Sequence, residues 1–248
     1  MNEQELCKKR LVDLSRQAEI KGFATFSSFL NLNELNIYHS IEKSLYTDSK
    51  GFGGYDGAER QMIAFIPDAL YFEFPIRCIK ITPKYPKFAE KLTHRDVLGS
   101  LMNLGIERST LGDILCLNDE YYVFCEKTIF PFIMENLTKI RHTMVDLKEE
   151  KEYQQLSSNI ELEERYDMIA SNRIDCIIAK AFHLSRSESA QLLASEKVFI
   201  NGKCITNCNQ SCEDGAIVSV RGKSRFVFAS SNTMSKKGKL RVKFMFYK

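Results

Sequence analysis

The chain has 248 residues, of which 44% are hydrophobic and 27% are charged, and its formal net charge is +3. This composition is that of an ordinary globular protein with one large domain or two to three small ones. No apolar run is long enough to cross a bilayer, and the polar first 20 residues do not have the pattern of a secretory signal. Eight cysteines in such a chain indicate reduced thiols. We therefore expect a cytoplasmic protein without a membrane partner.

The charge is distributed unevenly along the chain. Residues 171–248 contain 14 Lys/Arg and 5 Asp/Glu, a balance of +9, whereas residues 1–170 have a balance of −6. A basic C-terminal part on an acidic body indicates an anionic partner for that part, although a basic surface without any partner is the simpler alternative.

Residues 1–73 are predicted to be a mainly helical region. Leu6, Leu11, Leu14 and Ala18 have helical spacing, and "SSFLNLNELNIYHSIEKSL" begins at serines and carries an apolar stripe. The segment "KGFGGYDGAERQ" is interpreted as a glycine-rich loop that precedes a strand over "MIAFIP". It lacks the GK[ST] ending of a phosphate-binding loop, so tight turns explain its glycines better, although Lys50 and Arg60 are kept as candidates for RNA contact.

Residues 74–150 predict the element order β-α-β-β-α-β. "FPIRCIKI" alternates as a strand does, Thr93–Leu104 has helical spacing, and "DILCLNDEYYVFCE" predicts two strands about Asn118-Asp119. A helix with Pro131 in its first turn and a strand over "HTMVDLK" complete the series. This order indicates an RRM-like or ferredoxin-like sandwich, and hence an α+β fold class. The charged segment 151–170 is interpreted as a linker or an exposed strand.

The aromatic residues near the strands of this region have two interpretations. The set comprises Phe72, Phe74, Tyr121, Tyr122 and Phe124. RRM sheets stack bases on such rings, but packing in the core is the favoured interpretation.

Residues 171–248 predict two helices followed by a small twisted sheet. Ile174, Ile177, Ile178 and Ala181 form the core-facing stripe of the first helix. The second helix begins with a capping box, in which Ser185 is the N-cap and Glu188 the third helical residue. A phosphate is expected to bind well near Arg186 and Ser187, where free N–H groups and the helix dipole add to the charge of the arginine.

The strands of this region continue the basic surface. Asn201-Gly202 predicts a tight hairpin, Asp214-Gly215 another turn, and Arg221-Gly222 the bend of a second ribbon. In the tail, apolar residues from Leu240 to Phe246 alternate with cations. We expect one phosphate-binding edge that reads structured RNA by its shape. Its residues are Arg173, Lys180, Ser185, Arg186, Ser187, Lys203, Arg221, Lys223 and Arg225.

These residues resemble those of known RNA-binding families. "SNRIDCIIAKAFHLSRSESAQLLASEKVFINGK" followed by "DGAIVSVRGKSRFVF" resembles an S4 domain, in which the arginine equivalent to Arg186 and the cations near the hairpins bind RNA. "GFGGYDGAERQMIAFIPD" and "LTHRDVLGSLMNLGIERSTLGDIL" resemble the YlmH family. That resemblance implies an N-terminal region, an RRM-like domain, an S4 domain and binding to the large ribosomal subunit in quality control of stalled peptidyl-tRNA.

Three functions are compatible with the sequence. The first is a non-enzymatic factor that binds 23S rRNA or tRNA on the large subunit, with no cofactor, no metal, no catalytic residue and no small-molecule substrate. The second is an RNA-modifying enzyme of the pseudouridine-synthase kind, although the middle region looks too small for its catalytic fold. The third is a protein–protein adaptor that recruits a partner through its acidic N-terminal part.

Two further motifs are interpreted as structural. His94-Arg95-Asp96 matches the HRD of protein kinases, but the other kinase motifs are missing, so a helix capped by Thr93 is favoured over an RNA contact. Cys204, Cys208 and Cys212 recur every four residues without the close pairs and fourth ligand of a zinc site.

Overall fold

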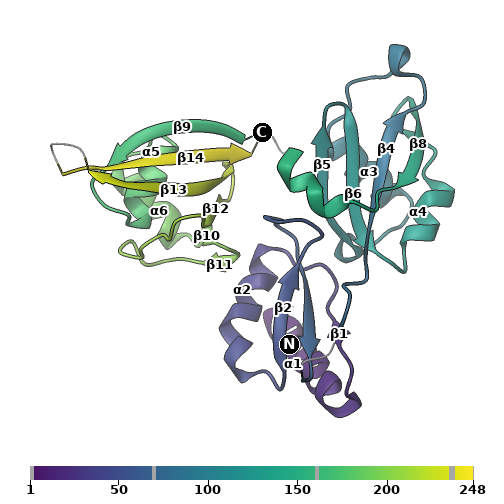
Figure 1. Cartoon of the computed structure of the whole chain (residues 1–248), viewed down its shortest axis with the longest axis horizontal. Coiled ribbons are helices and arrows are strands. Elements are labelled where there is room, and N and C mark those ends of the chain that lie inside the picture. The colour runs from purple at the N-terminus through teal and green to yellow at the C-terminus, as the bar shows by residue number, and fades with distance from the viewer. Residues whose placement is uncertain (1–2, 69–70, 160–161, 235–237, 248) are drawn as a thin grey trace. The chain divides into compact units, whose positions relative to one another are not determined.

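The computed structural model describes residues 3–68, 71–159, 162–234 and 238–247 (Figure 1). They belong to two compact units, Met1–Asn159 and Ile160–Lys248. Every strand pairing among the described residues is antiparallel, in three separate sheets, and helices pack on these sheets. This mixture is consistent with the α+β class expected from the sequence.

The first unit begins with a small sheet covered by two helices. The sheet has the order β1-β3-β2. Its elements are α1 (Glu3–Lys21), β1 (Thr25–Phe26), α2 (Leu32–Ile41), β2 (Asp48–Phe52) and β3 (Met62–Ile66). Leu11 and Ala18 from α1, Leu35 from α2, and Ile63 and Phe65 from β3 are all buried in one core. The apolar spacing of the helices therefore forms this core as expected.

Two details of the N-terminal prediction are wrong. The region is less helical than expected, because Thr25–Phe26 and Asp48–Phe52 pair with β3. The second helix begins after Asn31 and not at the serines, since the Asn31 side chain accepts hydrogen bonds from the N–H groups of Asn33 and Glu34. The Glu34 carboxylate accepts from Asn31 N in return, which completes a capping box.

The second part of this unit is a five-stranded sheet of order β5-β6-β4-β8-β7. The chain order of its main elements is β-α-β-β-α-β, with short helices η2 (Pro86–Phe88), η3 (Arg108–Thr110) and η4 (Tyr153–Asn159) between or after them. The elements are β4 (Ile76–Pro83), α3 (His94–Asn103), β5 (Leu111–Leu117), β6 (Glu120–Glu126), α4 (Phe130–Asn136), β7 (Lys139–Ile140) and β8 (Thr143–Glu149). Pro131 lies in the first turn of α4, as predicted.

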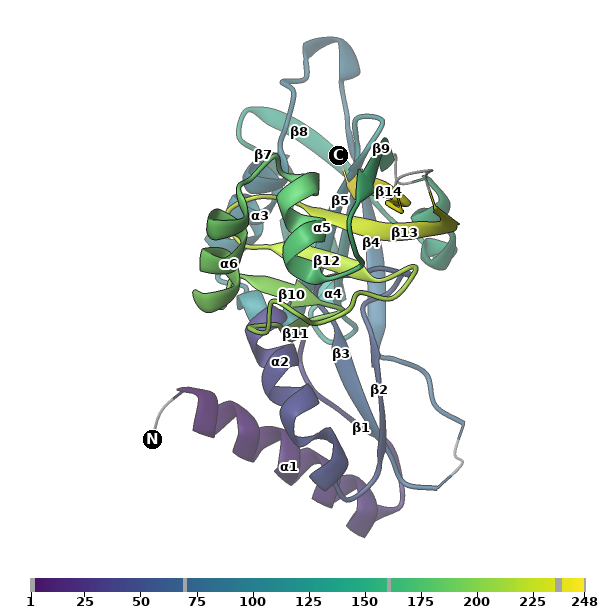
Figure 2. The same ribbon diagram turned by 90° about the vertical axis from the view of Figure 1, so that its left-hand side faces the viewer.

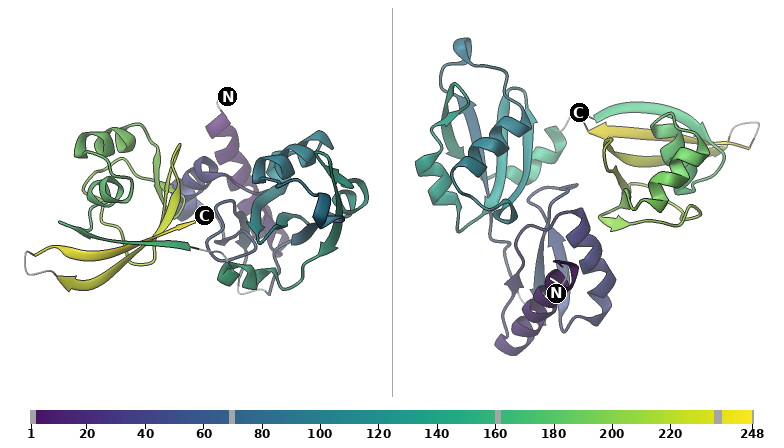
Figure 3. Two further views of the ribbon diagram at one scale, coloured as in Figure 1. Left: turned by 90° about the horizontal axis from the view of Figure 1, so that it is seen from above. Right: turned by 180° about the vertical axis from the view of Figure 1, so that it is seen from behind.

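The two faces of this sheet are buried differently. On one face, Ile79 and Val123 pack against Val97 and Leu101 of α3, which covers that face in Figure 3. On the other face, Phe124 is fully buried, with the rings of Tyr55 and Tyr153 at 5.1 and 5.9 Å. The sheet is therefore buried near Phe124 on its second face as well.

The glycine-rich loop joins the two parts of the first unit. Asp113 accepts hydrogen bonds from Tyr55 Oη at 2.7 Å, Glu59 N at 2.7 Å and Arg60 N at 3.1 Å. Gly54 has φ +104°, and a Cβ there would lie 2.3 Å from the Phe124 ring. Glycine is needed at this position for a close approach and a left-handed turn, which confirms the favoured interpretation of the loop.

The C-terminal unit is a six-stranded sheet of order β11-β10-β12-β13-β14-β9, with two helices on one side of it (Figures 2 and 3). The elements are β9 (Leu162–Ile169), α5 (Ile174–Ala181), α6 (Arg186–Ala194), β10 (Val198–Ile200), β11 (Lys203–Cys204), β12 (Ile217–Val220), β13 (Arg225–Met234) and β14 (Leu240–Tyr247). The hairpins turn where the sequence predicts, with positive φ at Asn201, Gly202, Gly215 and Gly222.

The helices and the sheet of this unit enclose one apolar core. The predicted stripe from Ile174 to Ala181 is buried, with exposures of 2% or less. It packs in the same cluster as Phe226, Phe228 and Phe244 from β13 and β14. The register Phe226↔Phe246 and Phe228↔Phe244 places these large rings opposite one another.

β9 (Leu162–Ile169) forms part of the segment 151–170 that was interpreted as a linker or an exposed strand. Leu162–Ile169 pairs along its length with β14, so the strand alternative is right for these residues. Residues 160–170 contain four Asp/Glu and one Arg, so the unit that starts at residue 160 has a balance of +6, lower than the +9 of residues 171–248. The basic excess therefore persists but is smaller.

Candidate nucleic-acid interface

The start of α6 has the capping box that the sequence predicts. Ser185 Oγ accepts from Glu188 N at 3.2 Å, and the Glu188 carboxylate accepts from Ser185 N at 2.7 Å. The hydrogen bonds from Ser185 hold the pKa of Glu188 below its ordinary value. Arg186 is the first residue of the helix, and its side chain is exposed. Glu188 stays ionised beside this corner, so the electrostatic attraction for a phosphate depends more on the surrounding cations than on the helix end alone.

The junction between α5 and α6 gathers one group of cations. Lys180, His183, Arg186 and Lys239 line one surface cavity of about 400 Å³. Lys180 Nζ also lies 3.2 Å from Asp167 Oδ1 of β9, in a partly exposed ion pair. The prediction omitted Lys239, although the sequence signal was available in the lysine-rich tail.

A second group of cations adjoins the first at Leu184. Leu184 also lines a neighbouring cavity of about 340 Å³, together with Glu188, Lys197 and Lys223. Lys223 Nζ lies 5.5 Å from the centre of the Phe182 ring. The prediction omitted Lys197, which directly precedes β10 within the S4-like segment. The two groups together place five cations along α6, from the residues before its start to Lys197 just after its end: Lys180, Arg186, Lys197, Lys223 and Lys239.

Aromatic rings hold the two arginines of the β12–β13 ribbon. Arg221 Cζ lies 5.3 Å from the centre of the Phe199 ring, and Arg225 Cζ lies 4.1 Å from that of Tyr247. The backbone N–H of Arg221 donates to Lys197 O at 2.8 Å, which brings this ribbon to the second cation group. Cation–π contacts of this kind restrict a guanidinium without neutralising its charge.

Two predicted residues lie apart from these groups. Arg173 is the N-cap of α5 and makes two bonds to Asp175, Nε–Oδ1 at 3.0 Å and Nη2–Oδ2 at 2.7 Å. It is seven residues from Lys180, or about 10 Å along the helix at 1.5 Å per residue. Lys203 pairs with Ile200 at one end of β10. Arg221 follows Val220, which pairs with Val198 at the other end of β10. The single continuous edge expected from the sequence is therefore a cluster around α6 and the β12–β13 ribbon, with Arg173 and Lys203 outside it.

The aromatic residues of the middle sheet pack as favoured. Tyr121, Tyr122 and Phe124 are buried, with exposures of 3%, 6% and 0%. Phe72 and Phe74 lie before β4 and are half-buried, and their ring centres are 5.5 Å apart. The buried rings on the strands are therefore not available for a base.

The motif His94-Arg95-Asp96 begins α3 and completes a capping box. Thr93 Oγ1 accepts from Asp96 N, and Asp96 Oδ2 accepts from Thr93 N at 2.8 Å. The hydrogen bonds that the Asp96 carboxylate accepts, from the Thr93 hydroxyl at 2.6 Å and from Thr93 N, lower the pKa of Asp96. The pKa of His94 is also lowered, mainly by burial and then by Arg108. The helix capped by Thr93 is therefore present, as predicted.

Arg60, kept as a candidate for RNA contact, has a structural role. Its guanidinium donates to the backbone oxygens of Phe29, Leu111 and Arg108 at 2.9, 2.9 and 3.1 Å. Burial lowers its pKa, and Asp113 opposes this effect. The side chain therefore joins the two parts of the first unit.

The residues that the structure describes hold neither a metal-binding cluster nor a membrane-spanning helix. Within them, no cluster of His, Cys, Asp and Glu side chains has the arrangement of a metal site, and the eight cysteines are free thiols. Burial raises the pKa of Cys212 to about 12, so this thiol is protonated at neutral pH. In the same part of the chain, no helix is long and apolar enough to span a bilayer.

Fold and surface together define an α+β protein whose basic C-terminal unit presents clustered cations of the kind that bind nucleic acid. Comparison with known proteins extends this description. Residues 71–155 match the family described as "Putative RNA-binding domain in YlmH". The chain is 27% identical over 195 residues to the ribosome-associated protein quality control protein P2 of Bacillus subtilis (strain 168). The aligned region covers 77% of this chain and 75% of that protein.

A solved structure is similar in fold. The cell division protein ylmH from Streptococcus pneumoniae matches with a TM-score of 0.51 at 23% identity, over 60% of this chain and 92% of that chain. The sequence matches are therefore to YlmH-related proteins, and the solved structure shows a similar fold.

Proposed function

We propose that the chain is a non-enzymatic factor that binds structured RNA, 23S rRNA or tRNA, on the large ribosomal subunit. The cation cluster along α6 carries this proposal, because five Lys and Arg side chains line two adjoining cavities there. Such contacts supply affinity and register without reading bases. The RNA-binding domain matched by residues 71–155 and the printed name of the Bacillus subtilis relative support the ribosome as the place of action, and with it the cytoplasm.

The same proposal assigns the domains. Residues 74–150 are an RRM-like domain, supported by the element order β-α-β-β-α-β and the strand order β5-β6-β4-β8. Residues 171–248 are an S4 domain with a C-terminal extension, to which β9 adds an edge strand, and residues 1–73 are a separate N-terminal region.

Within the S4 domain, the RNA-contacting set keeps the residues expected from the sequence. Ser185 and Ser187 place Arg186, while Lys180, Lys223, Arg221 and Arg225 surround it. Arg173 and Lys203 contact RNA at its periphery. Lys197 and Lys239 join the set because they line the same cavities.

The alternative of an RNA-modifying enzyme gains no support from the acid in this domain. Asp175 is 7% exposed and is held by two hydrogen bonds from Arg173 and one from Cys176 N. A catalytic aspartate needs access to its substrate, so the pairing favours a role in positioning α5.

The test is binding of a fluorescent hairpin RNA to the full chain over a series of salt concentrations. The affinity is expected to fall steeply with salt, and each lost phosphate contact is expected to reduce the log–log slope by roughly 0.7–0.9. Arg186→Ala and Lys223→Ala should each weaken binding and flatten this slope.

Lys243→Ala is the matched control. This cation belongs to the same sheet, but its Nζ is 2.8 Å from Glu164 Oε1 of β9 and it lines neither cavity. The affinity of the Lys243→Ala variant for the hairpin RNA, and the slope of its dependence on salt, should equal those of the unchanged protein. A slope that does not change in the double variant Arg186→Ala, Arg221→Ala would overturn the proposal. Co-sedimentation with purified large subunits then tests whether the RNA is ribosomal.

A further inference from the structure

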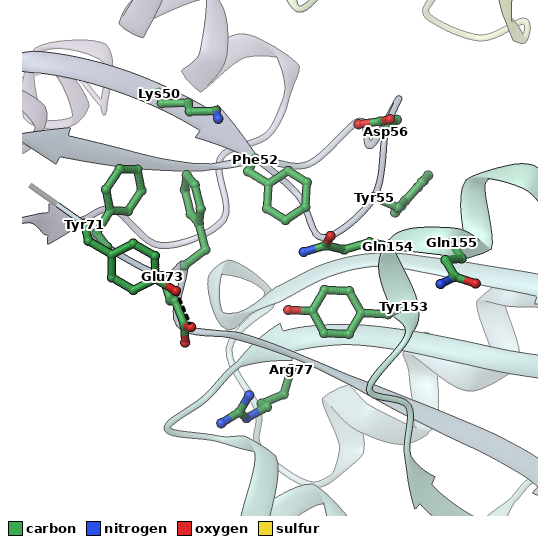
Figure 4. A pocket seen from close by; sticks show the side chains of 12 residues that line it. Lys50, Phe52, Tyr55, Asp56, Tyr71, Glu73, Arg77, Tyr153, Gln154 and Gln155 are labelled. Atoms are coloured by element: carbon green, nitrogen blue, oxygen red, sulfur yellow. Dashed lines mark hydrogen bonds between the residues drawn. The ribbon is translucent and has the colours of Figure 1, made fainter. Parts of the chain in front are cut away.

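The first unit contains a larger cavity, of about 670 Å³, outside the cation cluster (Figure 4). Three segments line it: the end of β2 with the loop that follows, the residues that lead into β4, and the start of η4. The volume lies within the range of roughly 300–1,000 Å³ that small-molecule sites occupy. All its lining residues belong to the same compact unit.

Aromatic rings form much of this cavity. Phe52 and Phe74 have ring centres 5.4 Å apart, and Phe72 lies 5.5 Å from Phe74. Tyr153 stands at the other side, with its ring edge-on to Phe124. These four residues are half-buried, so each ring keeps part of its surface open. Half-open rings around a cavity are typical of sites where unpaired bases stack.

The polar groups suit a base more than a chain of phosphates. Lys50 lies at one edge of the cavity and Arg77 at the opposite edge in Figure 4, while Asp56 and Glu73 balance their charge. Arg77 is also paired with Glu149 at 3.5 Å. The side-chain amide of Gln154, which offers both donors and an acceptor, points into the same hollow. The site is therefore formally neutral, aromatic and able to form directed hydrogen bonds.

The position of the cavity indicates RNA as its occupant. In an RRM-like sheet the stacking rings lie on the open face, but here Tyr55 and Tyr153 cover Phe124 on that face. The cavity lies beside Tyr55 and Tyr153, and its rings Tyr153 and Phe52 could stack on a base where the buried ring of Phe124 could not. Tyr71 and Gln155, the first and last residues of the segment that matches an RNA-binding domain, both line it.

We propose that this cavity binds one unstacked base of a single-stranded RNA segment, between Phe52 and Tyr153, with Gln154 at the base edge and Lys50 and Arg77 near the flanking phosphates. The proposal rests on the RNA-binding function proposed above and adds a second kind of contact. The cation cluster binds phosphates through many cations and is strongly sensitive to salt, whereas only Lys50 and Arg77 lie near phosphates at this cavity, so its sensitivity to salt should be smaller.

The experiment uses the full chain and a four-nucleotide single-stranded RNA that carries one 2-aminopurine between uridines. Stacking of the probe base on a ring quenches its fluorescence, so titration gives both the affinity and the environment of the base. We expect quenching that persists between 0.1 and 0.4 M salt. Tyr153→Leu and Gln154→Ala should each weaken binding by about tenfold, a typical loss for one base contact.

Phe88→Ala is the matched control, because Phe88 is an aromatic residue of the same unit, 88% exposed, that does not line the cavity. It should bind the probe as the unchanged protein does. Gln154 is exposed, so its truncation keeps the test valid if Tyr153→Leu proves unstable. An unquenched probe, or equal affinity in Gln154→Ala and the unchanged protein, would overturn the proposal. Salt-sensitive binding of the hairpin RNA in the same variants would leave the function of the C-terminal unit standing.

Discussion

Asp113 is expected to hold the two parts of the first unit together, and its removal gives a direct measure of that joint. The carboxylate accepts three hydrogen bonds from the loop at Tyr55, Glu59 and Arg60. Burial lowers the pKa values of Arg60 and Arg108, that of Arg108 to about 10. The charge of Asp113 opposes this effect at both guanidinium groups. Asp113→Ala therefore removes three bonds and leaves two neighbouring guanidinium groups without this acid.

The magnitude follows from these contacts. A hydrogen bond to a charged group contributes about 1.5–3 kcal/mol, but bonds that share one acceptor do not add fully. We expect a loss of about 3–5 kcal/mol in the free energy of unfolding, similar to the removal of one partner from a buried ion pair. Asp113→Asn keeps one acceptor oxygen and should cost less than Asp113→Ala.

Urea unfolding followed by circular dichroism and tyrosine fluorescence measures this loss. With a slope of about 2 kcal/mol per molar urea, 4 kcal/mol corresponds to a midpoint lower by about 2 M. Asp146→Ala, an exposed aspartate on β8 of the same sheet, is the control and should change stability by less than about 0.5 kcal/mol. If Asp113→Ala falls within the range of that control, the joint does not depend on this carboxylate and the reasoning is wrong.

Three other predictions concern the C-terminal unit. Phe226→Ala should lower the free energy of unfolding by about 3–5 kcal/mol, since the ring is fully buried in the core of the C-terminal unit. If the two units unfold independently, Phe226→Ala lowers the transition of the C-terminal unit and Asp113→Ala lowers that of the first unit. One shared transition, lowered by both variants, would contradict independent unfolding. Ser185→Ala should cost about 1 kcal/mol through the lost cap, checked by the same unfolding curves, and no loss would show that the cap is dispensable. The pKa of Glu188 is lowered in the folded state, so the ionised carboxylate contributes to the free energy of unfolding above the ordinary glutamate pKa, and this contribution disappears as pH falls through the lower folded value. NMR titration of the Glu188 carboxyl should give a pKa below the ordinary value, and an ordinary pKa would contradict this prediction.

Local signals in the sequence predict most of the elements. The capping box at Ser185 and Glu188, the stripe from Ile174 to Ala181 and the turn at Asn201-Gly202 each specify one element from adjacent residues. The short strand β1 was missed because two residues carry no periodic pattern, and its strand conformation depends on pairing with β3.

The candidate site was harder to predict, because it depends on distant residues. Lys239 reaches the cavity of Arg186 only through the tail, and Lys197 reaches Arg221 only through a backbone hydrogen bond between two turns. Arg173 was placed in the site by its charge, whereas the fold pairs it with Asp175 at the far end of α5. The acidic β9 could not be assigned to the basic unit from its composition, since strand pairing with β14 places it there.

The central claim is that RNA contacts the cations around α6 and the β12–β13 ribbon. Ultraviolet cross-linking of the full chain to native large ribosomal subunits, with mass spectrometry of the linked peptides, tests it most directly. We expect linked peptides within residues 180–197 and 221–225, and fewer of them in the Arg186→Ala, Arg221→Ala variant. Cross-links confined to α1 and α2, with none in the C-terminal unit, would contradict it.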